Sequence, residues 1–360
     1  MIQSVSASRG SGQVERGDAT MAFEEKRIKQ AYPHRIFTRK DGVEISLGDS
    51  LDFYQFWESP TVIISDGPYG IKGFPGDPPT VETLPELYEP HIREWSEKAL
   101  PSTTLWFWNT ELGWATIHPL LEKYGWEFRN CHVWNKGLGH VAGNANTKTL
   151  RKFPVVTEVC VQYVRTVKLP AKGVQDGLPI KEWLRYEWER TGLPFSKTNE
   201  ASGVKNAATR KYFTKDYLWY FPPADAFQKL VDYANQHGDP AEVPYFSIDG
   251  IRSLTGEEWE LMRAKFNCLF GINNVWNEPP IRNKERVKVG SKAVHLNQKP
   301  LSLTRTIIES SSEPGDVVWE PFGGMCTGAI ASRQLHRKCY SAEILADFYH
   351  SAVHRLEETE

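Results

Sequence analysis

This chain of 360 residues has no long hydrophobic run, no paired cysteines and no excess of charge of either sign. No apolar run approaches the roughly 18 residues that a membrane-spanning helix needs, so we expect no membrane segment. No charged-then-apolar leader opens the chain, so we expect no secretion signal. The formal net charge of −2 excludes a protein that is basic all over its surface. Any contact with nucleic acid must therefore come from a local basic surface.

The five cysteines form neither a CxxC pair nor a Cys/His cluster with the spacing of a zinc site. They are Cys131, Cys160, Cys268, Cys326 and Cys339. We therefore expect reduced thiols, a cytoplasmic location and no metal site. Tryptophan, in contrast, is abundant: the thirteen Trp residues suit both a buried core and the stacking of nucleic-acid bases.

Composition and periodicity divide the chain into three kinds of segment. Residues 1–30 are rich in Ser, Gly and charge without an apolar period, which predicts a disordered tail. In residues 31–165 and 290–360, β-branched apolar runs alternate with helical periods, which predicts an α/β fold around a mostly parallel sheet. Residues 166–289 interrupt this rhythm and are rich in Lys and Arg, so we expect an inserted domain with a basic face.

The periodicity also predicts individual elements. Strands are expected at residues 36–38, 44–51, 61–64, 104–108, 128–134, 155–164, 317–319 and 339–342. Helices are expected at residues 52–57, 84–100, 111–124, 180–189, 196–201, 206–213, 229–236, 300–312, 327–337 and 345–356.

Two strand ends place polar groups where a ligand could bind. The apolar run 61–64 stops at a corner that combines the carboxylate of Asp66, a bare backbone at Gly67 and the ring of Tyr69. This combination suits a flat ligand that carries an amine, such as a nucleic-acid base. The alternative is a surface turn after a core strand.

Residues 317–343 form the second such region, with the predicted order strand, Gly-rich turn, helix, strand and acid. Gly323 and Gly324 would let the backbone approach a ligand closely at a helix N-terminus. Glu343 could accept hydrogen bonds from ribose hydroxyls, and Asp49 from an adenine amine. The alternatives are that Asp49 caps a short helix and that Glu343 caps the last helix.

Two basic segments are candidates for contact with nucleic acid. The loop 135–152 either faces phosphates or is a plain solvated loop. In the insert, the expected helices 196–201 and 206–213 are joined by a Gly-containing turn and resemble a helix-turn-helix reader, although many such pairs bind nothing. The candidate DNA-binding residues are Lys136, Lys205, Asn206, Arg210 and Lys211.

Together these motifs resemble those of the amino-DNA-methyltransferases, which move a methyl group from S-adenosylmethionine to an exocyclic amine of adenine or cytosine. The family's corner of Asp, Asn or Ser followed by Pro-Pro-Tyr/Phe is similar to residues 66–69. Its loop Asp-Pro-Phe-x-Gly-x-Gly-Thr is similar to residues 320–327, and its His-x-x-Gln-Lys-Pro is matched in full at 295–300. A corner that precedes an insert, with the cofactor loop last, is the circularly permuted order of the β group.

The resemblance covers about residues 35–165 and 290–358 and implies roles for individual residues. The implied catalytic residues are Asp66, Gly67, Pro68 and Tyr69. The implied cofactor-binding residues are Glu320, Pro321, Phe322, Gly323, Gly324, Thr327, Glu343, Asp49, His295, Gln298, Lys299 and Pro300. The alternative for His295 and Lys299 is a simple surface position.

Two positions depart from the family pattern. Gly67 stands where the family has the first Pro of the corner, and because Gly has more conformational freedom we expect a less rigid corner. Cys326 replaces a glycine of the cofactor loop, so we expect the wall of the cofactor pocket to have a different shape. Neither change removes a group that the chemistry requires.

The resemblance implies direct methyl transfer to a base that is flipped out of the duplex. Tyr69 would stack on the base, while the Asp66 carboxylate and the Gly67 carbonyl would accept hydrogen bonds from its amine. No Pro-Cys pair is present, which argues against the cytosine-C5 class. Asp at the first corner position slightly favours adenine N6 over cytosine N4. The implied partners are double-stranded DNA and a cognate restriction endonuclease, with a monomer or a dimer as the assembly.

Two other functions remain open at this stage. A methyltransferase for RNA or for a protein amide would share the corner, but such enzymes usually keep the cofactor loop N-terminal and lack a large basic insert. A DNA-binding regulator could have the fold without catalysis. Cofactor binding would separate this regulator from an enzyme.

Overall fold

The computed structural model describes residues 36–73, 76–137, 148–149, 151–216, 218–281, 286, 288–289, 292–293 and 298–359. The expected tail at 1–30 and the candidate residue His295 lie outside this part of the chain.

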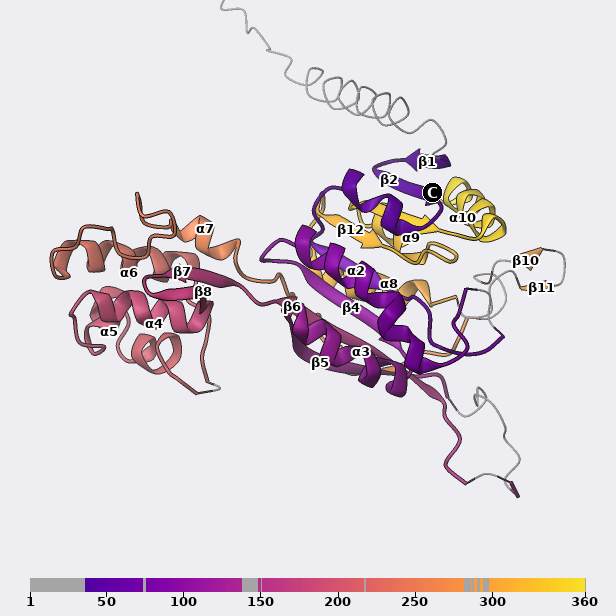
Figure 1. Ribbon diagram of the computed structural model, residues 1–360, viewed down its shortest axis with the longest axis horizontal. Coiled ribbons are helices and arrows are strands. Elements are labelled where there is room, and N and C mark those ends of the chain that lie inside the picture. The colour runs from indigo at the N-terminus through magenta and orange to yellow at the C-terminus, as the bar shows by residue number, and fades with distance from the viewer. Residues whose placement is uncertain are drawn as a thin grey trace, which may run out of the picture.

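A nine-stranded sheet runs through the larger body of the protein, with the strand order β1-β2-β13-β12-β3-β4-β6-β5-β9 (Figure 1). The five strands from β2 to β4 in this order are mutually parallel. β1 pairs antiparallel with β2, and β6 pairs antiparallel with both β4 and β5. The strands are β1 (Ile36–Lys40), β2 (Val43–Leu47), β3 (Val62–Ser65), β4 (Thr104–Asn109), β5 (Trp126–Asn135), β6 (Thr157–Arg165), β9 (Val275–Asn277), β12 (Val317–Glu320) and β13 (Lys338–Glu343).

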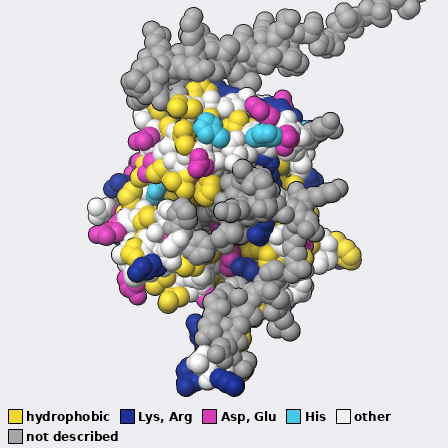
Figure 2. All heavy atoms as spheres, turned by 90° about the vertical axis from the view of Figure 1, so that its right-hand side faces the viewer, with side chains coloured by type: hydrophobic (Ala, Val, Ile, Leu, Met, Phe, Trp, Pro, Cys, Tyr) yellow, Lys and Arg dark blue, Asp and Glu magenta, His cyan; other side chains and the backbone are white. Residues whose placement is uncertain are grey.

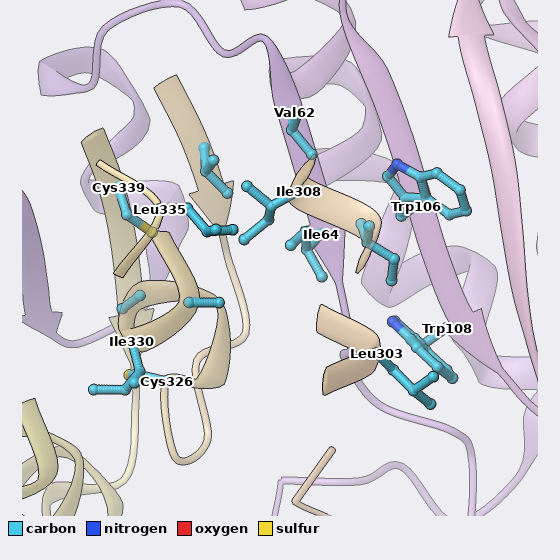
Figure 3. Packing of buried hydrophobic residues seen from close by; sticks show 14 of the residues in the cluster. Val62, Ile64, Trp106, Trp108, Leu303, Ile308, Cys326, Ile330, Leu335 and Cys339 are labelled. Carbon is cyan, nitrogen blue, oxygen red and sulfur yellow. The ribbon is translucent and has the colours of Figure 1, made fainter. Parts of the chain in front are cut away.

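Helices cover both faces of this sheet, which explains why β3, β4 and β12 are buried at every position and mostly apolar. Successive residues of a strand point to opposite faces. Val62 and Ile64 accordingly join one hydrophobic cluster, as Figure 3 shows, and Ile63 joins the other. The first cluster includes residues of α8 (Leu301–Ser311), α9 (Thr327–Gln334) and α10 (Ala346–Glu358), and the second includes residues of α2 (Leu84–Lys98) and α3 (Glu111–Lys123).

A third hydrophobic cluster lies in the segment between β6 and β9. Its buried members run from Leu169 to Trp259, and Figure 1 shows this segment as a separate group of elements beside the sheet. The elements are β7 (Lys168–Ala171), β8 (Val174–Pro179), α4 (Ile180–Arg190), α5 (Lys197–Ala201), η5 (Ala208–Tyr212), α6 (Ala224–His237) and α7 (Gly256–Glu260).

Several elements differ from the sequence predictions. The helix expected at 52–57 is two short 3₁₀ helices, η1 (Ser50–Asp52) and η2 (Tyr54–Phe56). The hairpin of β7 and β8 was not expected, because its strands are short and carry prolines. Strand β9 was also not expected; it pairs parallel with β5 and extends the sheet. The remaining elements are η3 (Val81–Thr83), β10 (Lys288–Val289) and β11 (Lys292–Ala293).

Among the helices described, none has the length and apolar character needed to cross a membrane.

Candidate active site

Polar side chains meet at the carboxyl ends of the parallel strands, where ligands bind in open α/β sheets. Asp66 directly follows β3, while Glu320 and Glu343 end β12 and β13. A pocket at this edge brings the corner, the cofactor loop and residues 298–299 together. Its lining residues are Ile64, Asp66, Trp108, Gln298, Lys299, Thr304, Glu320, Phe322, Gly323, Gly324, Met325 and Thr327.

A buried ionic cluster lies beside this pocket. The ammonium of Lys299, which is only 5% exposed, lies 2.6 Å from Oδ1 of Asp66 and 3.4 Å from Oε2 of Glu158. Lys136 pairs with the other oxygen of Glu158. The hydroxyl of Tyr69 donates to Asp66 at 3.0 Å or to Glu158 at 3.1 Å. The cluster therefore balances two carboxylates against two lysines.

The pKa values of the cluster follow from this pairing. Burial alone would lower the pKa of Lys299, but the attraction of Asp66 and Glu158 outweighs it and raises that pKa. Burial alone would raise the pKa of Glu158, but Lys299, Lys136 and the Tyr69 hydroxyl lower it. Both groups are therefore charged at neutral pH, and Lys299 is not the simple surface residue considered as the alternative.

Tyr69 does not present an open ring face in this arrangement. It is 8% exposed, and the Lys299 ammonium lies over its ring at 5.2 Å from the centroid. The carboxylate of Asp77 accepts the backbone N–H groups of Tyr69 and Gly70, which closes the end of the corner. Stacking of a base on Tyr69 stays a prediction.

The corner leaves one side-chain acceptor and one backbone acceptor for a ligand. The carbonyl of Pro68 accepts hydrogen bonds from the Tyr88 hydroxyl at 3.0 Å and from Nδ2 of Asn109 at 3.1 Å. Within the described part of the chain, no donor reaches Oδ2 of Asp66 or the carbonyl oxygen of Gly67. These two oxygens belong to neighbouring residues, as the hydrogen bonds of one amine would require.

Glu320 stabilises the start of α9. Its carboxylate accepts the backbone N–H groups of Gly328 at 2.6 Å and Ala329 at 3.0 Å, and the hydroxyl of Ser341 at 2.9 Å. A Cβ atom at position 328 would lie 2.8 Å from this carboxyl group, so only Gly fits there. Burial raises the pKa of Glu320 to about 7.

Cys326 adopts the left-handed backbone conformation, with φ +50, for which the family's glycine is suited. For a residue with a Cβ, the left-handed backbone conformation costs about 1–2 kcal/mol of free energy. The thiol is fully buried, and the Ser341 hydroxyl lies 3.3 Å from Sγ. A Cβ on Gly323 would lie 2.8 Å from Sγ, so the sulfur fills space beside Gly323 in the cofactor loop.

Glu343 and Asp49 both accept backbone hydrogen bonds. One oxygen of Glu343 accepts from the N–H of Gly324 at 2.6 Å and the other from that of Leu345 at 2.7 Å, so this residue joins the cofactor loop to the start of α10. Burial raises the pKa of Glu343. Asp49 accepts from the N–H of Leu51 at 2.9 Å and caps η1, as the alternative for this residue proposed.

The other residues of the cofactor set lie around the same loop. Pro321, Gln298 and Pro300 are buried, and Pro300 immediately precedes α8. Thr327 begins α9, and its hydroxyl accepts a hydrogen bond from Arg355 at 3.1 Å.

The four candidate DNA-binding residues of the insert are exposed, but the expected second helix is wrong. Arg210 and Lys211 lie in η5, which is a single π-helical turn, and Lys205 and Asn206 lie just before it. The side chain of Asn199 accepts the N–H groups that open this turn, so the chain does not form a regular helix-turn-helix. Lys136 lies instead in the ionic cluster, 4.9 Å from the Trp134 ring centroid.

The loop 135–152 lies mainly outside the described residues, but its basic end does not. Lys148, Arg151 and Lys152 are exposed. Figure 2 shows the face of the molecule that lies on the right in Figure 1. Lys and Arg side chains gather at its lower end, where this segment projects from the sheet.

Sequence reasoning missed three residues of the site: Glu158, Tyr88 and Asn109. Glu158 left a signal, because an acid inside the largely apolar strand expected at 155–164 is seldom buried without a partner. Tyr88 and Asn109 left none, because an aromatic residue in a helix and an amide at a strand end are common in any fold.

A family model described as DNA methylase, of the N6/N4 methyltransferase type, matches residues 61–354. This chain therefore belongs to the N6/N4 DNA methylase family, as the motifs predicted, and the expected α/β fold with its mostly parallel sheet is confirmed.

Among curated proteins, the chain is similar to the Type II methyltransferase M1.MboII of Moraxella bovis, with 26% identity over 195 residues that cover 52% of this chain and 66% of the relative. It is also similar to the DNA adenine methyltransferase YhdJ of Escherichia coli (strain K12), with 36% identity over 85 residues that cover 23% of this chain and 27% of the relative. The matched region thus spans less than two thirds of these relatives.

The solved structures that are similar to this one include the following two. The crystal structure of the M1.HpyAVI–SAM complex has a TM-score of 0.45 and 16% identity, and the match covers 87% of this chain and 98% of that one. The cytosine-N4-specific PvuII DNA methyltransferase has a TM-score of 0.48 and 11% identity, and the match covers 87% of this chain and 86% of that one.

Proposed function

We propose that this protein transfers a methyl group from S-adenosylmethionine to the exocyclic amine of a base flipped out of double-stranded DNA, with adenine N6 slightly favoured over cytosine N4. The observation that carries the proposal is the arrangement of Asp66 and Gly67. Lys299 and Tyr69 hold one oxygen of the Asp66 carboxylate. Its other oxygen and the Gly67 carbonyl are left for an amine beside the pocket.

The residues of the pocket fit the cofactor. Gly323 and Gly324 line the pocket with backbone that carries no Cβ, and the Glu343 carboxylate lies against this loop. The ring of Phe322 is held by His91, at 4.8 Å between ring centroids, and by Tyr88, at 5.6 Å. When bound, S-adenosylmethionine supplies an electrophilic methyl group on a positively charged sulfur. Asp49 is proposed to reach the adenine and Glu343 the ribose, in addition to their backbone contacts.

The protein's own groups act by orientation. Oδ2 of Asp66 and the carbonyl oxygen of Gly67 accept the two hydrogens of the amine, which turns the nitrogen lone pair away from the acceptors. Lys299 and Tyr69 keep the carboxylate from rotating, because both contact its other oxygen. Such positioning supplies much of the acceleration in group transfer. Oδ2 of Asp66 can also hold the proton that the amine loses.

The insert is proposed to contact DNA through exposed cations. Lys205, Asn206, Arg210 and Lys211 are exposed together around η5, and phosphate contacts supply most of the affinity of such surfaces. We propose the division into a catalytic domain (31–165 and 290–360) and a target-recognition domain (166–289). Because M1.MboII is named as a Type II methyltransferase, a cognate restriction endonuclease is proposed as a functional partner.

One experiment tests the transfer and identifies the base. The protein is incubated with mixed-sequence duplex DNA and labelled S-adenosylmethionine, and the DNA is digested to nucleosides for mass spectrometry. N6-methyladenine supports the whole proposal, and N4-methylcytosine corrects only the base. A protein that binds the cofactor but methylates no DNA, while it methylates RNA or a protein amide, refutes the proposal.

The variant Asp66→Ala tests the catalytic assignment in the same assay. Loss of the carboxylate should abolish transfer while cofactor binding, measured by calorimetry, stays nearly intact. Full activity of this variant would show that the assignment of Asp66 is wrong.

A further inference from the structure

Two side chains from different elements meet at the carbonyl of Pro68. Tyr88 on α2 donates its hydroxyl at 3.0 Å, and Asn109 at the end of β4 donates Nδ2 at 3.1 Å. Both residues are fully buried. The oxygen of Asn109 accepts the N–H of Thr110 at 2.9 Å, which fixes the orientation of the amide toward the corner. Because a carbonyl has two lone pairs, Pro68 cannot compete with Gly67 for a hydrogen of the target amine.

The same tyrosine occupies the space that a side chain at position 67 would need. A Cβ atom on Gly67 would lie 2.6 Å from the Tyr88 hydroxyl oxygen and 2.6 Å from Cδ2 of Phe322. The Phe322 ring is itself packed against His91 and Trp95, so its room to move is small. Proline, which the family has at this position, carries a Cβ and does not fit here while Tyr88 and Phe322 keep their places.

We infer that Tyr88, together with Asn109, is a positioning residue that holds the catalytic corner from outside and replaces the rigidity of the missing proline. The inference rests on the proposed function, because the group that it positions is the Gly67 carbonyl. It also explains the departure of this corner from the family pattern: glycine at 67 and the tyrosine hydroxyl at 88 belong together.

We call the two hydrogen bonds from Tyr88 and Asn109 to the Pro68 carbonyl the clamp. The variant Tyr88→Phe tests the clamp, because it removes one donor and keeps the packing of the ring. Loss of one hydrogen bond to the corner should lower kcat by about tenfold. The KM values for DNA and cofactor, and the cofactor Kd, should change by no more than about twofold, since neither ligand is bound by this hydroxyl. Tyr124→Phe is the matched control, because its hydroxyl contacts Glu89 away from the corner.

The variant Gly67→Pro tests the steric half of the inference. On its own it should lower kcat more than Tyr88→Phe does. The double variant Gly67→Pro/Tyr88→Phe should recover at least about twofold over Gly67→Pro, since it removes the contact with the hydroxyl and leaves only the contact with Phe322. Equal activity of Gly67→Pro and the wild type, or no recovery in the double variant, overturns the inference.

A measurement without turnover separates this inference from the proposed function. The ¹³C shift of the Pro68 carbonyl reports its hydrogen bonds and should move in Tyr88→Phe but not in Tyr124→Phe. An inactive wild-type protein whose carbonyl shift moves as expected refutes the proposed function and keeps the clamp. An active wild-type protein with unchanged kcat and an unchanged carbonyl shift in Tyr88→Phe refutes the clamp.

Discussion

At the scale of single residues, the two oxygens of Asp66 have different surroundings. One contacts the Lys299 ammonium and the Tyr69 hydroxyl, and both of these also contact Glu158. Glu158 thus helps to hold Lys299 and Tyr69 in the positions where they contact Asp66, although no contact between Glu158 and Asp66 is found. We therefore regard Glu158 as a positioning residue of the proposed reaction.

The variant Glu158→Gln should show this role. It leaves Lys136 and Lys299 with one carboxylate between them, and an uncompensated buried charge costs about 3–5 kcal/mol. We expect a loss of that size in the free energy of unfolding, measured with urea, together with a kcat that falls by about tenfold or more. Glu127→Gln, which removes an exposed pair with Arg129, is the control and should change neither value. Wild-type kcat in Glu158→Gln would contradict the role.

Glu320 predicts a pH dependence of stability. Burial raises its pKa from 4.5 to about 7, so between these pH values the folded protein holds a proton that the unfolded chain has released. The free energy of unfolding therefore falls as pH rises through this window, by on the order of 3 kcal/mol, and levels off above it.

Comparison with Glu320→Gln isolates this contribution. Burial lowers the pKa of His91 and His132 to about 4, so these two residues give an opposite slope below neutral pH, but they titrate in both proteins. Urea unfolding from pH 4.5 to 8 should show the wild type losing stability relative to the variant up to about pH 7. A difference that does not depend on pH would contradict the shift.

At the scale of elements, the strand ends and the loops after them form the site, while helices hold those loops. Glu320 stabilises the start of α9, Glu343 joins the cofactor loop to α10, and Tyr88 contacts the corner from α2. In the insert, the candidate DNA contacts lie in and just before a short π-helical turn and not on a regular helix.

The double variant Arg210→Ala/Lys211→Ala tests this turn. If both side chains contact phosphates, the affinity for duplex DNA should fall uniformly across sequences, and the slope of log K against log salt should decrease by about 2. The control Lys98→Ala/Lys338→Ala removes cations at the end of α2 and the start of β13. These positions lie at the amino ends of the parallel strands, whereas the candidate active site lies at their carboxyl ends. Equal affinity of the two double variants at moderate salt would refute contact by this turn.

At the scale of the whole molecule, two clusters sandwich the sheet and a third lies in the insert. The sheet cannot form from one half of the chain, because β12 and β13 lie between β2 and β3. The third cluster, in contrast, is built from consecutive residues 169–259. We therefore expect the insert to unfold separately from the sheet.

The variants Leu230→Ala and Ile308→Ala test this independence. Both side chains are fully buried, one in the third cluster and one in the first, and such truncations cost about 2–5 kcal/mol. Calorimetry should show Leu230→Ala lowering one transition while cofactor binding persists, and Ile308→Ala lowering another. A single transition that both variants lower equally would show that the two bodies unfold as one unit.

The sequence by itself determined the features that depend on neighbouring residues. Apolar runs of β-branched and aromatic residues predicted β3, β4, β12 and β13, and the motifs near their ends predicted Asp66, Glu320 and Glu343 as candidate site residues. The family could be predicted from the spacing and order of these motifs. Each motif is shorter than ten residues and can therefore be read directly from the sequence. The regular helix expected at 206–213 was wrong, since Asn199 hydrogen bonds impose a different turn there.

The tertiary structure alone decided which distant groups meet. Lys299 contacts Asp66 across 233 positions of sequence, and Tyr69 contacts Glu158 across 89. The Tyr88 hydroxyl reaches Pro68 only because α2 folds back over the sheet. Contacts of this kind depend on how helices pack on both faces of the sheet and not on any local pattern. For this reason the sequence predicted a candidate catalytic corner at residues 66–69, and only the fold showed what holds this corner in place.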